Sequence, residues 1–382
     1  MEEWINCPLG EILNFRRGHD LPHTEMAGGD IPVAGSNGII GFHNEASPIS
    51  PCITIGRSGN VGIPFMYNRA WAHNTTLYID DFKGNDPLYI FYLLKTLPLS
   101  SFGGGSAVPT LNRNHIHPLI VKHCTNVSVQ RRIASVLKSF DDKIELNNRI
   151  NHNLEMQAQA LYKSWFVDFE PFRGGKFVDS ELGLIPIGWD AKPLSSICHI
   201  EKKTINPQKY PTCLFTHYSI PAYDNSELPE LQKGSDILSN KYIISDYTIL
   251  FSKLNPRIKR IWNVYQSESN PICSTEFVVY KPMNIDTYPF LYSFITGDVF
   301  YNNIMSKVNG ATGSHQRFHP EETLDILVPY HIDCYRLYSQ LVLPIIQQID
   351  ENKRENHYFS SLRDSLLPKL MSGELKINDL TC

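Results

Sequence analysis

The sequence of 382 residues lacks the features that mark membrane proteins, disulfide-rich domains and zinc proteins. No apolar stretch approaches the roughly 20 residues of a transmembrane helix, and the opening Met-Glu-Glu-Trp is unlike a signal peptide. The eight cysteines are scattered without a C-x-x-C pair, so we expect reduced thiols in a cytoplasmic protein. His115 and His117 form the one close histidine pair without a cysteine ligand set, and we expect no metal.

The motifs of common catalytic sites are also missing. No G-x-x-x-x-G-K-[ST] phosphate loop occurs, because Gly174-Gly175-Lys176 is followed by Phe177 instead of a magnesium-binding hydroxyl. There is no G-x-G-x-x-G turn for a dinucleotide or methyl donor, and no Asn-Pro-Pro-aromatic tetrapeptide of an amino-methyltransferase. A G-x-S-x-G elbow and an H-E-x-x-H helix are absent as well. The sequence therefore predicts a chain that is not an enzyme by itself and needs no cofactor.

What the sequence does contain is one heptad pattern that occurs twice, 205 residues apart. The seam residues of the first copy recur at the same spacing in the second: Ile144, Asn147, Asn151 and Leu154 correspond to Ile349, Asn352, Asn356 and Phe359. Such spacing keeps one apolar stripe on one side of a supercoiled helix, and a buried Asn needs a polar partner. We predict an antiparallel helix pair that brings Asn147 near Asn356 and Asn151 near Asn352. The alternative is that each amphipathic helix packs separately on its own domain.

Two residues of the second copy depart from the pattern. Proline is excluded from a helix interior, so we expect the continuous helix to begin at Pro344. Arg363 stands at a seam position that is otherwise apolar.

The segments outside the helices repeat more faintly. A Trp-Pro-Leu-Ile pattern at Trp4, Pro8, Leu9 and Ile12 returns at Trp189, Pro193, Leu194 and Ile197. Short β-type runs such as Cys52–Gly56 dominate both segments, and helices are expected at 88–97 and 288–295. The expected fold class is mixed α+β, with two α/β heads, a pair of long antiparallel coiled-coil helices and an internal pseudo-twofold repeat. The expected segments are a first head (1–127), a central helix (128–167), a linker (168–188), a second head (189–335) and a distal helix (336–378).

Three segments carry a resemblance to a known family. Asp179–Trp189, with the sequence DSELGLIPIGW, resembles the entry to the second recognition domain of type I restriction-modification specificity subunits. Gln130–Ala134 and Asp168–Pro171, which flank the first long helix, resemble the central conserved region of that family, and Arg363–Glu374 resembles its distal one. The resemblance extends over the whole chain.

This resemblance implies a DNA sequence-specificity subunit that performs no chemistry itself. Two target-recognition domains would read the two halves of a split site in double-stranded DNA, and the helices would set the gap. The implied protein partners are two methylation subunits, with restriction subunits in the full complex. Two alternatives stay open: a duplicated protein-binding scaffold without a DNA role, and a single-chain DNA-modifying enzyme with an unrecognised site. The net charge of −4 argues against binding to anionic DNA, although the distribution of charge over the surface matters more than its sum.

Candidate DNA contacts lie in glycine-flanked loops of the first head and in a cationic segment of the second. In such loops the backbone can approach a phosphate, while Arg and Asn side chains can contact base edges. In the first head these candidates are Ser36, Asn37, Arg57, Ser58, Asn60, Thr110, Asn112 and Arg113. In the second head they are Lys253, Asn255, Arg257, Lys259, Arg260, His315, Gln316 and Arg317. The competing interpretations are tight turns whose polar residues cap neighbouring strands, and a solvated surface loop.

The outward faces of the helices are the predicted docking surfaces for partner subunits. The polar residues expected there are Gln130, Arg131, Arg132, Lys138, Lys143, Lys353 and Arg354. Duplication of the helix favours two copies of one partner on equivalent surfaces.

Overall fold

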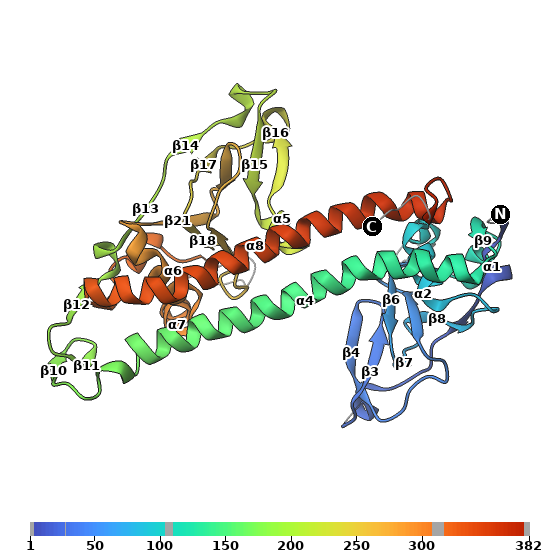
Figure 1. Cartoon of the computed structure of the whole chain (residues 1–382), viewed down its shortest axis with the longest axis horizontal. Helices are drawn as coiled ribbons and strands as arrows, with labels where there is room; N and C mark the ends of the chain where they lie inside the picture. Colours follow the sequence, from blue (N-terminus) through green and yellow to red (C-terminus); the bar gives the residue numbers. More distant parts are fainter. Residues whose placement is uncertain (1–3, 27, 104–109, 308–316, 378–382) are drawn as a thin grey trace. The chain divides into compact units, whose positions relative to one another are not determined.

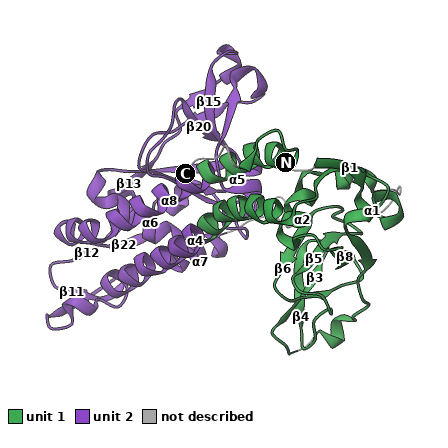
Figure 2. Cartoon of the chain, turned by 45° about the vertical axis from the view of Figure 1, so that its right-hand side comes forward, with its two compact units in different colours: residues 1–145, 358–382 green, residues 146–357 purple. Residues whose placement is uncertain are grey.

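The structure, a computed structural model, describes residues 4–26, 28–103, 110–307 and 317–377. The chain divides into two compact units, unit 1 from residues 1–145 with 358–382 and unit 2 from residues 146–357 (Figure 2). Two helices of 40 residues each, α4 (Val127–Phe166) and α8 (Ile332–Met371), contribute to both units (Figure 1). The predicted mixed α/β character is confirmed, whereas the five segment boundaries stay a prediction.

Unit 1 is built around a four-stranded antiparallel sheet of order β2-β8-β5-β6. Its inner strand β5 (Cys52–Gly56) is buried at every position, and its Cys-Ile-Thr-Ile-Gly sequence suits a strand covered on both faces. A three-stranded sheet, β4-β3-β7, and the pair β1-β9 complete the unit. The other strands are β1 (Trp4–Pro8), β2 (Asn14–Arg17), β3 (Ile31–Gly35), β4 (Gly38–His43), β6 (Pro64–Tyr67), β7 (Trp71–Ala72), β8 (Thr76–Asp81) and β9 (Ile120–Cys124). The helices are α1 (Leu9–Ile12), α2 (Pro87–Thr96) and α3 (Arg113–Ile116).

Unit 2 has a four-stranded sheet of order β13-β21-β18-β19 and a five-stranded sheet of order β14-β17-β20-β15-β16. Two further pairs, β10-β11 and β12-β22, lie at its ends in the sequence. The strands are β10 (Phe177–Ser180), β11 (Gly183–Pro186), β12 (Asp190–Pro193), β13 (Cys198–Ile200), β14 (Thr204–Ile205), β15 (Leu214–Tyr218), β16 (Glu230–Lys233), β17 (Lys241–Ile243), β18 (Thr248–Ser252), β19 (Ile261–Val264), β20 (Pro271–Ser274), β21 (Phe277–Pro282) and β22 (Leu327–Tyr330). The helices are α5 (Ile220–Ser226), α6 (Tyr288–Thr296) and α7 (Asp298–Ser306).

Strand pairing follows one order in both units. In unit 1, β3 pairs antiparallel with β4 and parallel with β7; in unit 2, β15 pairs antiparallel with β16 and parallel with β20. In each unit an early strand pairs with the strand that precedes a long helix, β1 with β9 before α4 and β12 with β22 before α8. Unit 2 adds β14 and β17 at the β20 side of its sheet, together with α5.

In unit 2 the two long helices contact each other through paired asparagines. The Asn147 amide donates to Asn356 Oδ1 at 2.9 Å, and the Asn352 amide donates to Asn151 Oδ1 at 2.7 Å. The later residue of α4, Asn151, pairs with the earlier residue of α8, Asn352, so the two helices run antiparallel here. Asn147, Asn151 and Asn352 are buried, and an unpaired buried amide would cost about 1–3 kcal/mol. These layers therefore fix the helix register.

In unit 1 the helices meet through aromatic, aliphatic and charged residues. Phe140 and Phe359 have ring centroids 6.0 Å apart, and Leu137 and Leu370 belong to one buried cluster with the head. Arg363 donates to Asp141 of α4, which explains a charged residue at a seam position. The remaining predicted seam residues also lie at or near the interior: Ile349 is buried, and Ile144, Leu154 and Phe359 are half-buried.

The prediction that the second long helix begins at Pro344 is wrong. Helix α8 begins at Ile332 and continues through Pro344. A proline inside a helix costs about 3 kcal/mol because it removes one hydrogen bond and crowds the preceding turn. The turns before it bury Tyr335, Tyr338 and Val342 completely, and this burial of apolar surface outweighs the cost.

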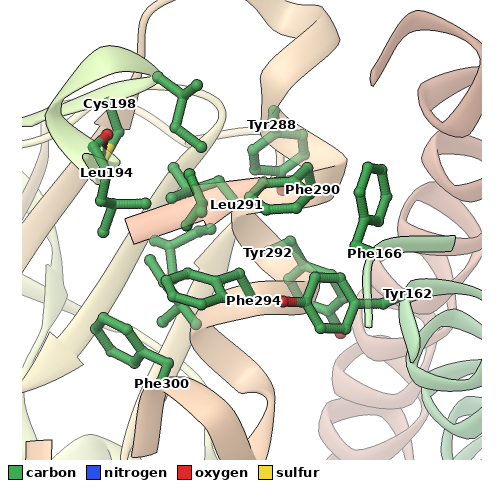
Figure 3. Packing of buried hydrophobic residues seen from close by; sticks show 14 of the residues in the cluster. Tyr162, Phe166, Leu194, Cys198, Tyr288, Phe290, Leu291, Tyr292, Phe294 and Phe300 are labelled. Carbon is green, nitrogen blue, oxygen red and sulfur yellow. Dashed lines mark hydrogen bonds between the residues drawn. The ribbon is translucent and has the colours of Figure 1, made fainter. Parts of the chain in front are cut away.

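The core of unit 2 joins its head to the helices through aromatic rings. Tyr162 and Phe166 of α4 face Phe290 of α6, with ring centroids 5.6 and 4.8 Å apart (Figure 3). Phe290 also stacks on Tyr335 of α8 at 4.5 Å. Offset and edge-to-face aromatic pairs each add about 0.5–1.5 kcal/mol beyond area burial, so this cluster holds α6 rigidly on both helices.

Candidate nucleic-acid interface

In unit 1 the end of strand β5 continues into a tight glycine loop. A Cβ on Gly56 would lie 1.8 Å from the Asn60 carbonyl oxygen, so only glycine fits this close approach. Gly59 and Gly62 have φ of +83° and +82°, the left-handed region that glycine adopts without strain. The Gly62 amide then closes the loop on the Gly56 carbonyl at 2.9 Å. The loop exposes Asn60 at its tip.

Arg57, the first residue after β5, is held by its backbone on both sides. Its N–H donates to the Thr75 carbonyl at 2.8 Å, and its own carbonyl accepts from the Leu111 N–H at 2.7 Å. The second bond draws the 110–113 segment to the end of β5, where Ser58 and Thr110 form an isolated bridge. Residues that are 52 and 54 positions apart in the sequence are thus neighbours.

A concavity of about 380 Å³ lies at this strand end. It is lined by Arg16, Arg17, Arg57, Leu77, Thr110, Leu111, Asn112 and Arg113, and we call it the arginine cleft. Arg113 donates to the Phe15 carbonyl at 3.1 Å, and Arg57 donates to the Asn74 carbonyl at 3.4 Å, so two guanidinium groups are anchored on the backbone. The lining includes four arginines and no carboxylate.

The predicted residues of unit 1 divide between the arginine cleft and its surroundings. Arg57, Thr110, Asn112 and Arg113 line the cleft, whereas Ser36 and Asn37 form the turn between β3 and β4. Asn112 accepts from the Asn114 N–H at 3.0 Å and caps α3, as the competing turn interpretation expected for such residues.

Sequence reasoning missed Arg16 and Arg17, because nothing in the sequence places β2 in one sheet with β5, next to the 110–113 segment. The available signal was an Arg-Arg pair at the end of a short strand, directly before Gly18. Gly18 allows close packing there, since a Cβ would lie 2.1 Å from the His73 carbonyl oxygen.

Unit 2 places Lys253 where unit 1 places Arg57. Lys253 follows β18, and its N–H donates to the Glu276 carbonyl at 2.9 Å, just before β21. Arg317 donates two hydrogen bonds to the Glu276 carboxylate, at 3.3 and 3.1 Å. Asn255 adopts φ +48° in the turn that follows. His315 and Gln316 lie outside the described residues.

The cationic segment of unit 2 is largely engaged within the chain. Lys259 pairs with Asp298 at 3.2 Å and lies over the ring of Tyr301, while the Arg257 side chain is exposed. Arg260 is buried and makes two hydrogen bonds to Asp224 of α5, at 2.6 and 2.9 Å. Arg260 therefore anchors α5 to β19, and its buried guanidinium is engaged by Asp224 and does not present a surface for DNA.

One nearby histidine, His117, is held neutral. His117 Nε2 accepts from the Phe15 N–H at 3.1 Å, next to the arginine cleft. Burial lowers the pKa of His117, and the positive charges of Arg113 and Lys83 lower it further. The ring therefore stays an acceptor at neutral pH and supports β2 at the edge of the cleft.

Nothing in the described ranges suggests a metal centre or a membrane span. Within them, no cluster of three or more His, Cys, Asp or Glu side chains could hold a metal ion. No helix among them is both long enough and apolar enough to cross a bilayer. Burial raises the pKa of the Cys52 thiol to about 12, so this cysteine is an inert core residue.

Comparison with known proteins gives the relationship of this chain. Residues 1–156 match the family model described as the type I restriction modification DNA specificity domain. The type I restriction enzyme MjaIX specificity subunit of Methanocaldococcus jannaschii is 30% identical over 311 residues, covering 76% of this chain and 70% of that protein. The HindI specificity subunit of Haemophilus influenzae is 59% identical over 44 residues, 12% of this chain and 10% of that protein.

The fold matches as well. The crystal structure of the type I restriction-modification S subunit from M. genitalium superposes with a TM-score of 0.64, at 16% identity, covering 97% of this chain and 96% of that one. The extent and identity of the MjaIX match, with this shared fold, show that the chain belongs to the specificity subunits of type I restriction enzymes.

Proposed function

We propose that this chain is the DNA-reading subunit of a type I restriction-modification complex in the cytoplasm, without catalytic residues or cofactor of its own. Its two heads would each read one half of a split site in double-stranded DNA, and helices α4 and α8 would set the gap. The observation that carries this proposal is the common strand order of the two units, which ends in unlike loops after β5 and β18. One framework with two different tips suits two different half-sites.

The proposed contacts are the exposed and half-buried polar residues at these strand ends. In unit 1 they are Ser36, Asn37, Arg57, Ser58, Asn60, Thr110, Asn112 and Arg113. In unit 2 they are Lys253, Asn255, Arg257, Lys259 and Arg317, together with His315 and Gln316 from the sequence. Two heads that approach one face of the duplex would place half-site centres about one helical turn, roughly 10 bp, apart.

Two equivalent grooves support a pair of identical protein partners. In unit 1, a groove of about 360 Å³ lies between the start of α2 and α4, where Arg131 pairs with Asp86 at 3.7 Å. In unit 2, a groove of about 470 Å³ lies between η7 (Ile285–Thr287) and α8, where Arg336 pairs with Asp286 at 3.3 Å. Arg131 and Arg336 occupy the same position of the repeated helix pattern. We propose that two methylation subunits dock here and that restriction subunits join the full complex.

One residue of the predicted docking surface is excluded by its burial. Gln130 is fully buried and donates to the Asn85 side chain and to the Cys124 carbonyl, at 2.8 and 2.7 Å. It fastens α4 to the head and offers no outward surface. Arg131 and Lys138 do line the groove of unit 1.

Methylome sequencing of cells that express the complete system tests the proposal. The parent chain should yield a gapped motif with two different half-sites. Asn60→Ala should relax selection in one half-site only and Arg257→Ala in the other, because each lost base contact costs about 1–3 kcal/mol at its own position. Asn68→Ala, an exposed asparagine of unit 1 outside the proposed contacts, is the matched control and should leave the motif unchanged. A continuous parent motif, or one variant that alters both half-sites alike, would refute the two-head model.

A further inference from the structure

The two units carry different charge patterns at equivalent strand ends. Arg16 lies opposite Tyr78, the third residue of β8, and the Glu201 N–H donates to the carbonyl of Val279, the third residue of β21. Unit 2 thus has Glu201 where unit 1 has Arg16. The next residues, Arg17 and Lys202, are both cations.

Two of the cations that unit 2 has at this place have carboxylate partners. Lys202 forms an ion pair with Glu321, and Arg317 is held by the Glu276 carboxylate at 3.1 Å. In unit 1 the corresponding cations converge on the arginine cleft, whose lining includes no acid. Arg17 does contact Asp20, but at 3.5 Å, whereas the Lys202 ammonium makes a close hydrogen bond to Glu321; all four side chains are more than half exposed, so each pair contributes little to stability.

The arginine cleft matches a phosphate group better than a base edge. Guanine, the preferred partner of arginine, presents two acceptors in the major groove, which one guanidinium saturates. Four guanidinium groups around one concavity repel each other and need an anion with several acceptor oxygens to relieve that repulsion. The backbone bonds of Arg57 and Arg113 hold two of them in place before any ligand arrives, which lowers the entropic cost of binding.

We propose that the arginine cleft binds a backbone phosphate of DNA, with Arg16 and Arg17 as phosphate-binding residues. Unit 1 is then the electrostatic anchor of the subunit and supplies most of its sequence-independent attraction to DNA. Unit 2, with its carboxylates in place, reads its half-site with little net charge contribution. This inference rests on the proposed DNA-reading function and adds a division of labour between the heads.

The salt dependence of DNA affinity tests this division. The full chain, assembled with its methylation subunits, is titrated with two labelled duplexes between 50 and 200 mM salt. One duplex carries the parent motif found by methylome sequencing, and the other has both half-sites scrambled. Arg16→Ala and Arg17→Ala should each lower the slope of log affinity against log salt by about 0.9, weaken both duplexes equally and leave the methylated motif unchanged. Lys202→Ala, at the position in unit 2 that corresponds to Arg17, is the matched control and should leave the slope unchanged.

Several results would overturn the inference. They are an unchanged slope for both arginine variants, a loss confined to the specific duplex, or an equal drop in slope for Lys202→Ala. Arg16→Lys, which keeps the charge, guards against an effect of misfolding, because it should restore the parent slope. If the parent gives a gapped motif but the slopes do not move, only the anchor assignment fails. If the parent gives no gapped motif, the proposed function itself fails.

Discussion

The two heads are fastened to the long helices by different chemistry. Tyr92 is the sixth residue of α2 and donates to the Asp141 carboxylate of α4 at 2.6 Å. Ser293 is the sixth residue of α6 and shares a hydrogen bond of 2.8 Å with the Tyr338 hydroxyl of α8. One framework therefore tolerates either a charged or a neutral contact between head and helix.

The surroundings extend this contrast. In unit 1, Asp141 also accepts from Arg363 and lies 3.9 Å from the Lys95 ammonium, whose pKa is lowered by burial while Asp141 opposes that shift. In unit 2, Gln159 donates to the Ser293 carbonyl and to the Thr296 hydroxyl, at 3.0 and 2.8 Å, beside the aromatic cluster of Figure 3. The difference teaches that unit 1 depends on ionic contacts, which salt weakens, and unit 2 on buried rings and neutral bonds.

The largest loss of stability should come from the aromatic contacts between α6 and the two long helices. Phe290→Ala removes a fully buried ring that contacts both long helices, and large-to-small changes of this kind cost about 3–5 kcal/mol. Denaturant unfolding of the full chain measures the loss, and methylome sequencing should show relaxed selection in one half-site only. Met156→Ala, at an exposed site of α4, is the control and should change stability by less than about 0.5 kcal/mol. A Phe290→Ala chain as stable as the parent would contradict the assigned role of this cluster.

The ionic fastening of unit 1 should give a smaller, salt-dependent effect. Asp141→Ala leaves Tyr92, Arg363 and Lys95 without their shared acceptor, and we expect a loss of about 1–3 kcal/mol. Thermal unfolding at low and high salt checks the ionic contribution, because the difference in melting temperature between parent and variant should become smaller as the salt concentration rises. The neighbouring Asp142→Ala breaks only a surface pair with Lys138 and should have little effect. Equal losses for the two aspartate variants would remove the contrast between the units.

The smallest expected effect is on the salt dependence of DNA binding, and it comes from the strand end of unit 2. Glu276→Gln should weaken the hold on Arg317 and free its charge, so that unit 2 gains one cation for DNA. The expected result is a rise of about one in the salt slope of DNA binding, measured with the scrambled duplex. Glu322→Gln, an exposed glutamate of unit 2 without a proposed contact, serves as the control. A slope that stays at the parent value after Glu276→Gln would mean that Arg317 does not reach DNA.

The sequence was informative wherever structure depends on near neighbours in the chain. The heptad pattern named Asn147 with Asn356 and Asn151 with Asn352, and these pairs are hydrogen-bonded. The buried strand Cys52–Gly56 was named with its bounds, and the helix expected at 88–97 is α2 to within one residue. Helical periodicity and runs of β-branched residues are local signals, so a single sequence suffices for them.

Features that depend on distant segments were not predictable in this way. Arg16 and Arg17 reach the arginine cleft only because β2 pairs with β8 and β8 with β5. The burial of Gln130 and the ion pair of Arg260 likewise depend on residues 36 or more positions away. The helix start predicted at Pro344 was wrong because the burial of aromatic residues before it is a tertiary effect that local rules do not include.

The proline within α8 makes the two docking grooves unlike. Pro344 has no N–H, so the Gln340 carbonyl lacks its usual donor four residues later. Both residues line the groove of unit 2. In the groove of unit 1 the residue that corresponds to Pro344 is Ser139, which has an N–H for the usual helix hydrogen bond. Two copies of one partner would therefore meet one additional hydrogen-bond acceptor at unit 2 and none at unit 1.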